Sequence, residues 1–85
     1  MTYRIVWGAA AESMLAEIWV DSGDRAGVAA AAAALEVALS HHPLKIGESR
    51  TSSVHRVAYD PPLGIEYEVV EDDKKVIVQG VFSRG

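Results

Sequence analysis

Apolar residues recur at helical spacing in two consecutive segments of the chain, residues 9–20 and 25–40. The apolar residues of the first segment are Ala11, Met14, Leu15, Ile18 and Trp19. Those of the second segment are Val28, Ala31, Ala32, Leu35 and Leu39. The break between the segments contains Gly23, which suits a left-handed C-terminal cap, and Asp24, which can cap the next helix. Two helices joined by so short a break predict a helical hairpin.

Strand-like patterns lie on both sides of this hairpin. Runs of β-branched and aromatic residues, or alternation of apolar and polar residues, predict strands at 3–7, 54–59, 65–70 and 75–82. The polar segment 45–52 lacks such a pattern, so we expect a loop there, and we expect a turn at 71–74. The predicted fold class is α+β, with the order β-α-α-β-β-β and a helical hairpin packed on a small, mainly antiparallel sheet.

The length of the chain limits how much apolar surface it can bury. Its 85 residues are enough for a single domain, 1–85, which would bury only about 60–65% of the surface that the unfolded chain exposes. Apolar residues make up 49% of the sequence, and cysteine is absent, so no disulfide can add stability. This apolar surplus suggests that a partner chain or self-association buries part of the apolar surface.

Charge and hydropathy restrict the function classes. The formal net charge is −4, whereas proteins that work on RNA or DNA usually carry a basic patch. No apolar stretch approaches the roughly 18 residues of a membrane span, and the N-terminal residues lack an apolar targeting region. We therefore expect a cytoplasmic protein that does not bind a membrane. The pair His41-His42 lacks the spacing and the third ligand of a metal site, so we expect neither a metal nor another cofactor.

Several motifs in the second half of the chain resemble a known family. Leu39, Pro43, Gly47 and Arg50 form a spaced passage at the end of the second helical segment. Further along, the strand containing Tyr67-Glu68-Val69 is followed by an acidic turn and a valine-rich last strand. Together with the element order, these features resemble the RelE/ParE superfamily, the toxins of bacterial type II toxin–antitoxin pairs.

This resemblance implies a growth inhibitor and a protein partner. The partner would be a cognate antitoxin whose C-terminal segment wraps the helical hairpin and the sheet. RelE-like members cleave messenger RNA on the ribosome, whereas ParE-like members block DNA gyrase without nuclease chemistry. Two alternatives to the general toxin hypothesis therefore stay open: a ribosome-dependent endoribonuclease that needs no metal, and a non-toxic interaction or homodimer module with the same fold.

The catalytic candidates that the resemblance implies are Arg50, Arg56 and Arg84, which would hold the phosphate as cations. Two other basic positions of RelE-like enzymes are replaced, one by Ala58 and one by Leu63 or Gly64. The sequence also ends before the tail that carries the last catalytic residue in RelE-like enzymes. These departures and the acidic charge balance favour a protein that is weakly nucleolytic or not nucleolytic at all.

Strand parity gives an expectation for the sheet. His55 and Arg56 are neighbours in a predicted strand, so their side chains should point to opposite faces. We expect Val57 and Tyr59 to face the core, which would place Arg56 on the outer face near Glu66 and Glu68 of the next strand. We interpret both tryptophans, Trp7 and Trp19, as core residues.

Overall fold

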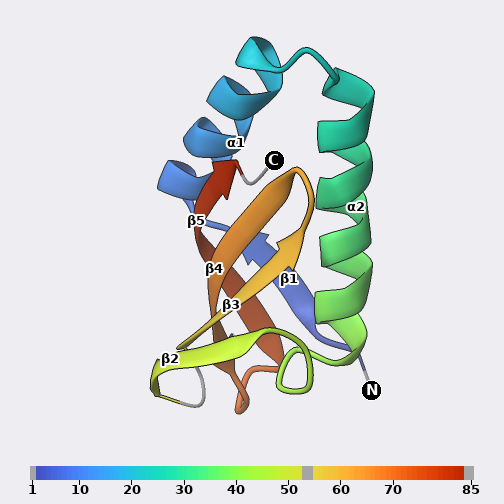
Figure 1. Cartoon of the computed structure of the whole chain (residues 1–85). Helices are drawn as coiled ribbons and strands as arrows, with labels where there is room; N and C mark the ends of the chain where they lie inside the picture. The colour runs from blue at the N-terminus through green and yellow to red at the C-terminus, as the bar shows by residue number, and fades with distance from the viewer. Residues whose placement is uncertain (1, 53–54, 84–85) are drawn as a thin grey trace.

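The computed structural model describes residues 2–52 and 55–83, except for the side chains of 50–52 (Figure 1). The element order is β-α-α-β-β-β-β. The elements are β1 (Arg4–Trp7), α1 (Ala9–Asp21), α2 (Arg25–His41), β2 (Glu48–Ser52), β3 (His55–Asp60), β4 (Leu63–Val70) and β5 (Lys75–Ser83).

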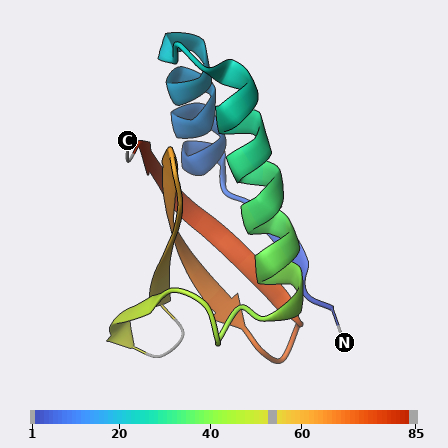
Figure 2. The same ribbon diagram turned by 45° about the vertical axis from the view of Figure 1, so that its right-hand side comes forward.

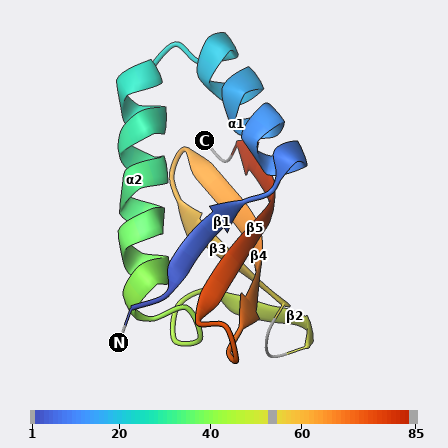
Figure 3. The same ribbon diagram turned by 180° about the vertical axis from the view of Figure 1, so that it is seen from behind.

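The strands form one mixed sheet in the order β1-β5-β4-β3-β2. β1 pairs with β5 in parallel, and Figure 3 shows the two strands side by side. All the other neighbours in the sheet pair in antiparallel fashion. The two helices lie together on one side of this twisted sheet (Figure 2). The predicted α+β class, with a helical hairpin on a mainly antiparallel sheet, is therefore confirmed.

The core lies between the helices and the central strands. The predicted stripe of α2 is buried through Val28, Ala31, Leu35 and Leu39, whereas α1 buries only Ala11 completely. The sheet contributes the fully or almost fully buried side chains Leu63, Ile65, Tyr67, Val69, Val76 and Val78. Alternation along β4 thus places Ile65, Tyr67 and Val69 on the helix-facing side, as the sequence predicted. In the part of the chain that the structure describes, no helix is long and apolar enough to cross a membrane.

The junction between the helices is fixed by Asp24 and not by glycine. The Asp24 carboxylate accepts a hydrogen bond from the backbone N–H of Gly27 at 3.0 Å, which satisfies one of the unpaired donors at the start of α2. The predicted left-handed cap at Gly23 is wrong, because α1 ends in an extended cap at Ser22 and Gly23 has no positive φ. The hydroxyl of Ser22 accepts from the backbone N–H of Asp24 instead.

Segment 45–52 corrects the predicted strand count. It was expected to be a loop, but its second part forms β2, an antiparallel edge strand paired with β3 through Glu48 and Val57. An edge strand has one side open to solvent, so polar residues such as Glu48 and Ser49 are compatible with it and leave no apolar alternation to detect. The strand β2 is therefore defined by its backbone pairing with β3 and not by a pattern in its sequence.

A cluster of polar side chains joins Tyr3, which directly precedes β1, to the turn between β4 and β5. The hydroxyl of Tyr3 donates to one carboxylate oxygen of Glu71, and the Lys74 ammonium donates to the other at 2.7 Å. The backbone of Tyr3 also donates to the carbonyl of Ser40 at 2.7 Å, near the end of α2. The cluster therefore joins three parts of the chain at one corner of the molecule.

This cluster predicts a pH-dependent contribution to stability. The hydrogen bonds from Lys74 and Tyr3 lower the pKa of Glu71, and those same bonds raise the pKa values of Lys74 and Tyr3. Because the carboxylate pKa is depressed in the folded protein, its contribution is present above the ordinary pKa of glutamate and disappears as the pH falls through the lowered value. The contributions of Lys74 and Tyr3 are lost only in alkaline solution, as the pH rises through their raised values.

We predict that Glu71→Gln lowers the melting temperature at neutral pH and that the difference from the wild type vanishes in acid. The measurement is a series of thermal unfolding curves for both proteins between about pH 3 and about pH 7. Asp72→Asn is the control, because Asp72 is exposed in the same turn and has no ion pair among the described residues. A difference that is the same at all pH values would contradict the assignment.

Candidate functional site

The faces of β3 are exchanged relative to the prediction. His55 and Arg56 do point to opposite sides, but the register pairs Arg56 with the buried Tyr67 and His55 with Glu68. Directly paired residues share a face, so Arg56 lies on the helix-facing side and away from the outer Glu66 and Glu68. Both Val57 and Ala58 are buried, so exposure does not alternate along this part of β3. Strand parity alone therefore assigned the core to the wrong face of this strand.

Arg56 holds the loop that leads from α2 to β2. Its guanidinium donates to the carbonyl oxygens of Ile46 and Gly47 at 3.1 Å each and to the hydroxyl of Ser49 at 3.0 Å. The hydroxyl of Tyr67 lies within hydrogen-bonding distance of the carbonyls of Pro43, at 2.9 Å, and Ile46, at 3.0 Å. Burial raises the pKa of Tyr67, and the hydrogen bond with Arg56, together with the Arg56 charge, acts against this rise. The two side chains therefore act together as an anchor for the loop.

The spaced passage that suggested the family has a structural explanation in this loop. Leu39 and Pro43 are buried, and Gly47 has a φ of +71°, a conformation that side chains other than glycine's rarely adopt. A Cβ at Gly47 would press against the carbonyl oxygen of Val57 and lie 2.9 Å from the hydroxyl of Tyr67. These residues therefore shape the chain between α2 and β2, and with it the position of Arg50 in β2.

The outer face of the sheet carries acidic and neutral polar groups near its centre. The imidazole Nε2 of His55 lies 3.8 Å from a carboxylate oxygen of Glu68, and the amide of Gln79 donates to that same oxygen at 3.1 Å. Glu66 lies on the same face and opposes Gly80, and the β4–β5 register is irregular between Glu66 and Tyr67. At 3.8 Å, His55 and Glu68 are within ion-pair distance but beyond the hydrogen-bond distance that direct proton transfer needs.

The three arginines proposed as catalytic differ in how much of each residue the structure describes. Arg50 lies in β2, but its side chain is outside the described residues, and Arg84 lies outside them entirely. Arg56 is described, and its guanidinium donates hydrogen bonds to Ile46, Gly47 and Ser49 of the loop. Within the described residues, no group of three or more His, Cys, Asp or Glu side chains could hold a metal ion.

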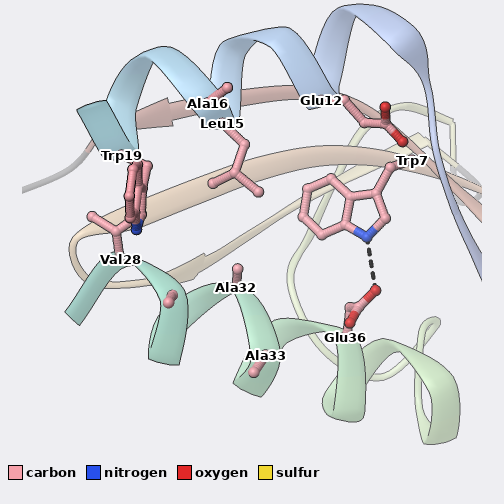
Figure 4. Close-up of a pocket in the computed structure, with 10 residues that line it drawn as sticks. Trp7, Glu12, Leu15, Ala16, Trp19, Val28, Ala32, Ala33 and Glu36 are labelled. Atoms are coloured by element: carbon pink, nitrogen blue, oxygen red, sulfur yellow. Dashed lines mark hydrogen bonds between the residues drawn. The ribbon is translucent and has the colours of Figure 1, made fainter. Parts of the chain in front are cut away.

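A groove with a volume of about 610 Å³ lies between α1 and α2 (Figure 4). Its lining is almost wholly apolar. The residues that line it are Trp7, Glu12, Leu15, Ala16, Trp19, Val28, Ala29, Ala32, Ala33 and Glu36. In Figure 4 Leu15, Ala16 and Trp19 come from α1, Ala32 and Ala33 come from α2, and Trp7 lies at one end between Glu12 and Glu36. We call this surface the interhelical groove.

Two interactions hold the tryptophans in the interhelical groove. The indole N–H of Trp7 donates to the Glu36 carboxylate at 2.8 Å, which links β1 to α2. At the other end, the Arg25 guanidinium stacks 4.8 Å from the centre of the Trp19 ring and donates to the backbone carbonyls of Trp19 and Val20. Trp7 is half-buried against the core, as expected, but Trp19 is 43% exposed, so its interpretation as a core residue is wrong.

The comparisons with known proteins support the fold. A chain from the crystal structure of the toxin–antitoxin complex RelBE2 of Mycobacterium tuberculosis is similar, with a TM-score of 0.73 and 21% sequence identity. The superposition covers 99% of this chain and 100% of that chain. Neither the models of known protein families nor the curated proteins give a match. The fold expected from the resemblance is therefore present over the full length of the alignment.

The loop anchor predicts a large difference between two glycine substitutions. Gly47→Ala should lower the free energy of unfolding by at least about 2 kcal/mol, because it adds left-handed strain and a collision with the Val57 carbonyl. Gly23→Ala is the matched control. Its Cβ would meet nothing within 4 Å, so the stability should stay the same or rise by up to about 1 kcal/mol. Urea unfolding of the two variants is the measurement, and equal losses would refute the role of Gly47.

Proposed function

We propose that this chain is the toxin component of a type II toxin–antitoxin pair, a cytoplasmic growth inhibitor that a cognate antitoxin neutralises. The observation that carries the proposal is the whole-chain likeness to a chain of the RelBE2 toxin–antitoxin complex. The spaced passage from Leu39 to Arg50 supports it, because in this structure those residues shape the loop between α2 and β2. The exposed apolar lining of the interhelical groove provides a surface on which an antitoxin could bind.

The electrostatics of the sheet favour inhibition by binding over efficient cleavage of RNA. Metal-free cleavage needs a base, an acid and cations that stabilise the phosphate in the transition state. The centre of the outer face carries Glu66 and Glu68, and carboxylates there repel a phosphate. Arg56, which the resemblance named as a cation, lies on the opposite face and holds the loop. We therefore propose that the chain acts by occupying a target such as the ribosome or DNA gyrase.

The nuclease alternative assigns the chemistry to different residues. The resemblance named Arg50, Arg56 and Arg84 as the phosphate clamps, but Arg56 lies on the helix-facing side of the sheet. In the nuclease alternative His55 with Glu68 would therefore transfer the proton on the outer face, and Arg50 or Arg84 would hold the phosphate there. His55 and Glu68 are about one-third to two-fifths exposed, so replacing them should leave the fold intact. The double variant His55→Ala/Glu68→Gln therefore separates the two mechanisms without disturbing the loop anchor.

We predict that induction of the wild-type chain alone stops bacterial growth and that the double variant stops it equally well. The measurement combines growth curves with parallel pulse-labelling of protein and DNA synthesis. An early loss of protein labelling would indicate the ribosome as the target, and an early loss of DNA labelling would indicate gyrase. Co-expression of a neighbouring reading frame that encodes a small antitoxin-like protein should restore growth.

Two outcomes would count against the proposal. If the wild-type chain has no effect on growth, the toxin assignment fails and the non-toxic interaction module becomes the better hypothesis. If the double variant loses toxicity while its thermal unfolding matches that of the wild type, the chain acts through proton transfer and is a nuclease. Induction of a Gly47→Ala variant gives the level of toxicity that a poorly folded chain retains.

A further inference from the structure

The net charge of this protein is concentrated in its helical layer. Residues 9–41, which include both helices and their junction, contain five carboxylates and one arginine. The carboxylates are those of Glu12, Glu17, Asp21, Asp24 and Glu36. The rest of the chain contains seven acidic and seven basic residues and is formally neutral. The formal charge of −4 therefore belongs entirely to the layer that contains the interhelical groove.

The interhelical groove combines an apolar floor with an acidic end. Trp19 and Val28 line the apolar end away from Trp7, and Leu15 lies between the two ends. On the α2 side the small side chains of Ala29, Ala32 and Ala33 allow a partner helix to approach closely. Glu12 and Glu36 are its charged lining residues, and both lie at the end occupied by Trp7 (Figure 4). Val28 and Glu36 are eight residues apart on α2, so the groove spans about 12 Å, or roughly two turns of a helix.

We propose that the interhelical groove binds an amphipathic α-helix of a partner protein and that this helix carries a lysine or arginine at the Glu12–Glu36 end. The apolar side chains of the partner helix pack on Leu15, Trp19 and Ala32, and its cation lies between the two carboxylates. The inference rests on the proposed function in naming the antitoxin as the source of that helix. The partner segment is therefore basic and apolar, and complementary to the acidic helical layer.

The same charges disfavour a second copy of this chain as the occupant. Helix α1 contains Glu12, Glu17 and Asp21 and no basic residue, so a second α1 would bring carboxylates against carboxylates. Helix α2 offers Arg25, but its guanidinium is already stacked on Trp19 and bonded to two backbone carbonyls. A homodimer through this surface would also bring together two layers that each carry a formal charge of −4.

The test uses a phage-displayed library of amphipathic helical peptides, panned against the full chain. Apolar residues occupy fixed positions at helical spacing, and the flanking positions are randomised among basic, acidic and neutral polar residues. The expected result is enrichment of lysine or arginine at the flanking positions. An enriched peptide should also shift the indole N–H resonance of Trp7 in an NMR spectrum of the chain, because this group lies at the acidic end of the groove.

The matched variants are Glu12→Lys and Glu17→Lys, which make the same charge change on the same helix. Glu12 lines the groove and Glu17 does not. An enriched basic peptide should bind Glu12→Lys roughly tenfold more weakly and Glu17→Lys less than about twofold more weakly than the wild type. Far-UV circular dichroism and thermal unfolding confirm that both variants fold.

Four results would overturn the inference. They are no enriched peptide, no preference for basic residues, equal losses of affinity in the two variants, and a chain that forms a homodimer with which the enriched peptide competes. None of them depends on growth inhibition, because binding is measured on the purified chain. A protein that binds basic helices but does not stop growth would keep the inference and reject the toxin assignment.

Discussion

The position of α2 over the sheet depends on Tyr67. This side chain is 1% exposed at the centre of β4, and its hydroxyl reaches the carbonyls of Pro43 and Ile46 just beyond the end of α2. A buried hydroxyl without a partner would cost free energy, so the loop must stay where its carbonyls can accept. Arg56 reinforces the same loop from the next strand. The end of α2 is thereby fixed on the sheet, and one wall of the interhelical groove with it.

The interhelical groove exists because the two helices pack on the sheet to different extents. Helix α2 buries a full stripe against the sheet, whereas α1 buries only Ala11 completely and leaves Met14, Trp19 and Val20 exposed. Apolar area that a small chain leaves in water favours association, because its burial stabilises a complex by roughly 25 cal/mol per Å². In the described part of the molecule, the apolar interhelical groove lies on the helical layer, which also carries the net negative charge of the chain.

The sequence predicted the elements whose pattern repeats and missed those defined by contacts between elements. The stripe of α2 and the burial of Ile65, Tyr67 and Val69 followed directly from periodicity. The edge strand β2 had no apolar pattern to detect, because its stability comes from pairing with β3.

The face of β3 was assigned wrongly for a steric reason. We expected the larger Val57 to mark the core, but the smaller Ala58 belongs to the main cluster beneath α2, where a small side chain allows the helix to approach closely. The interhelical groove could not be predicted either, since its shape depends on the angle between two helices and on the position of Trp7 from β1. Glu12 and Glu36 form the acidic end of the groove, but they lie on different helices. Their spacing in the sequence therefore does not indicate that they lie near each other.

The most direct test of the account is collisional quenching of tryptophan fluorescence by acrylamide. The chain has two tryptophans, and both line the interhelical groove, so its tryptophan emission reports on that surface. The measurement compares the free chain with its complex with the product of the neighbouring reading frame, in which any tryptophan is replaced by phenylalanine. If the partner covers the interhelical groove, the quenching constant should fall clearly when the complex forms. A stable complex with an unchanged quenching constant would show that the partner binds elsewhere and would contradict the account.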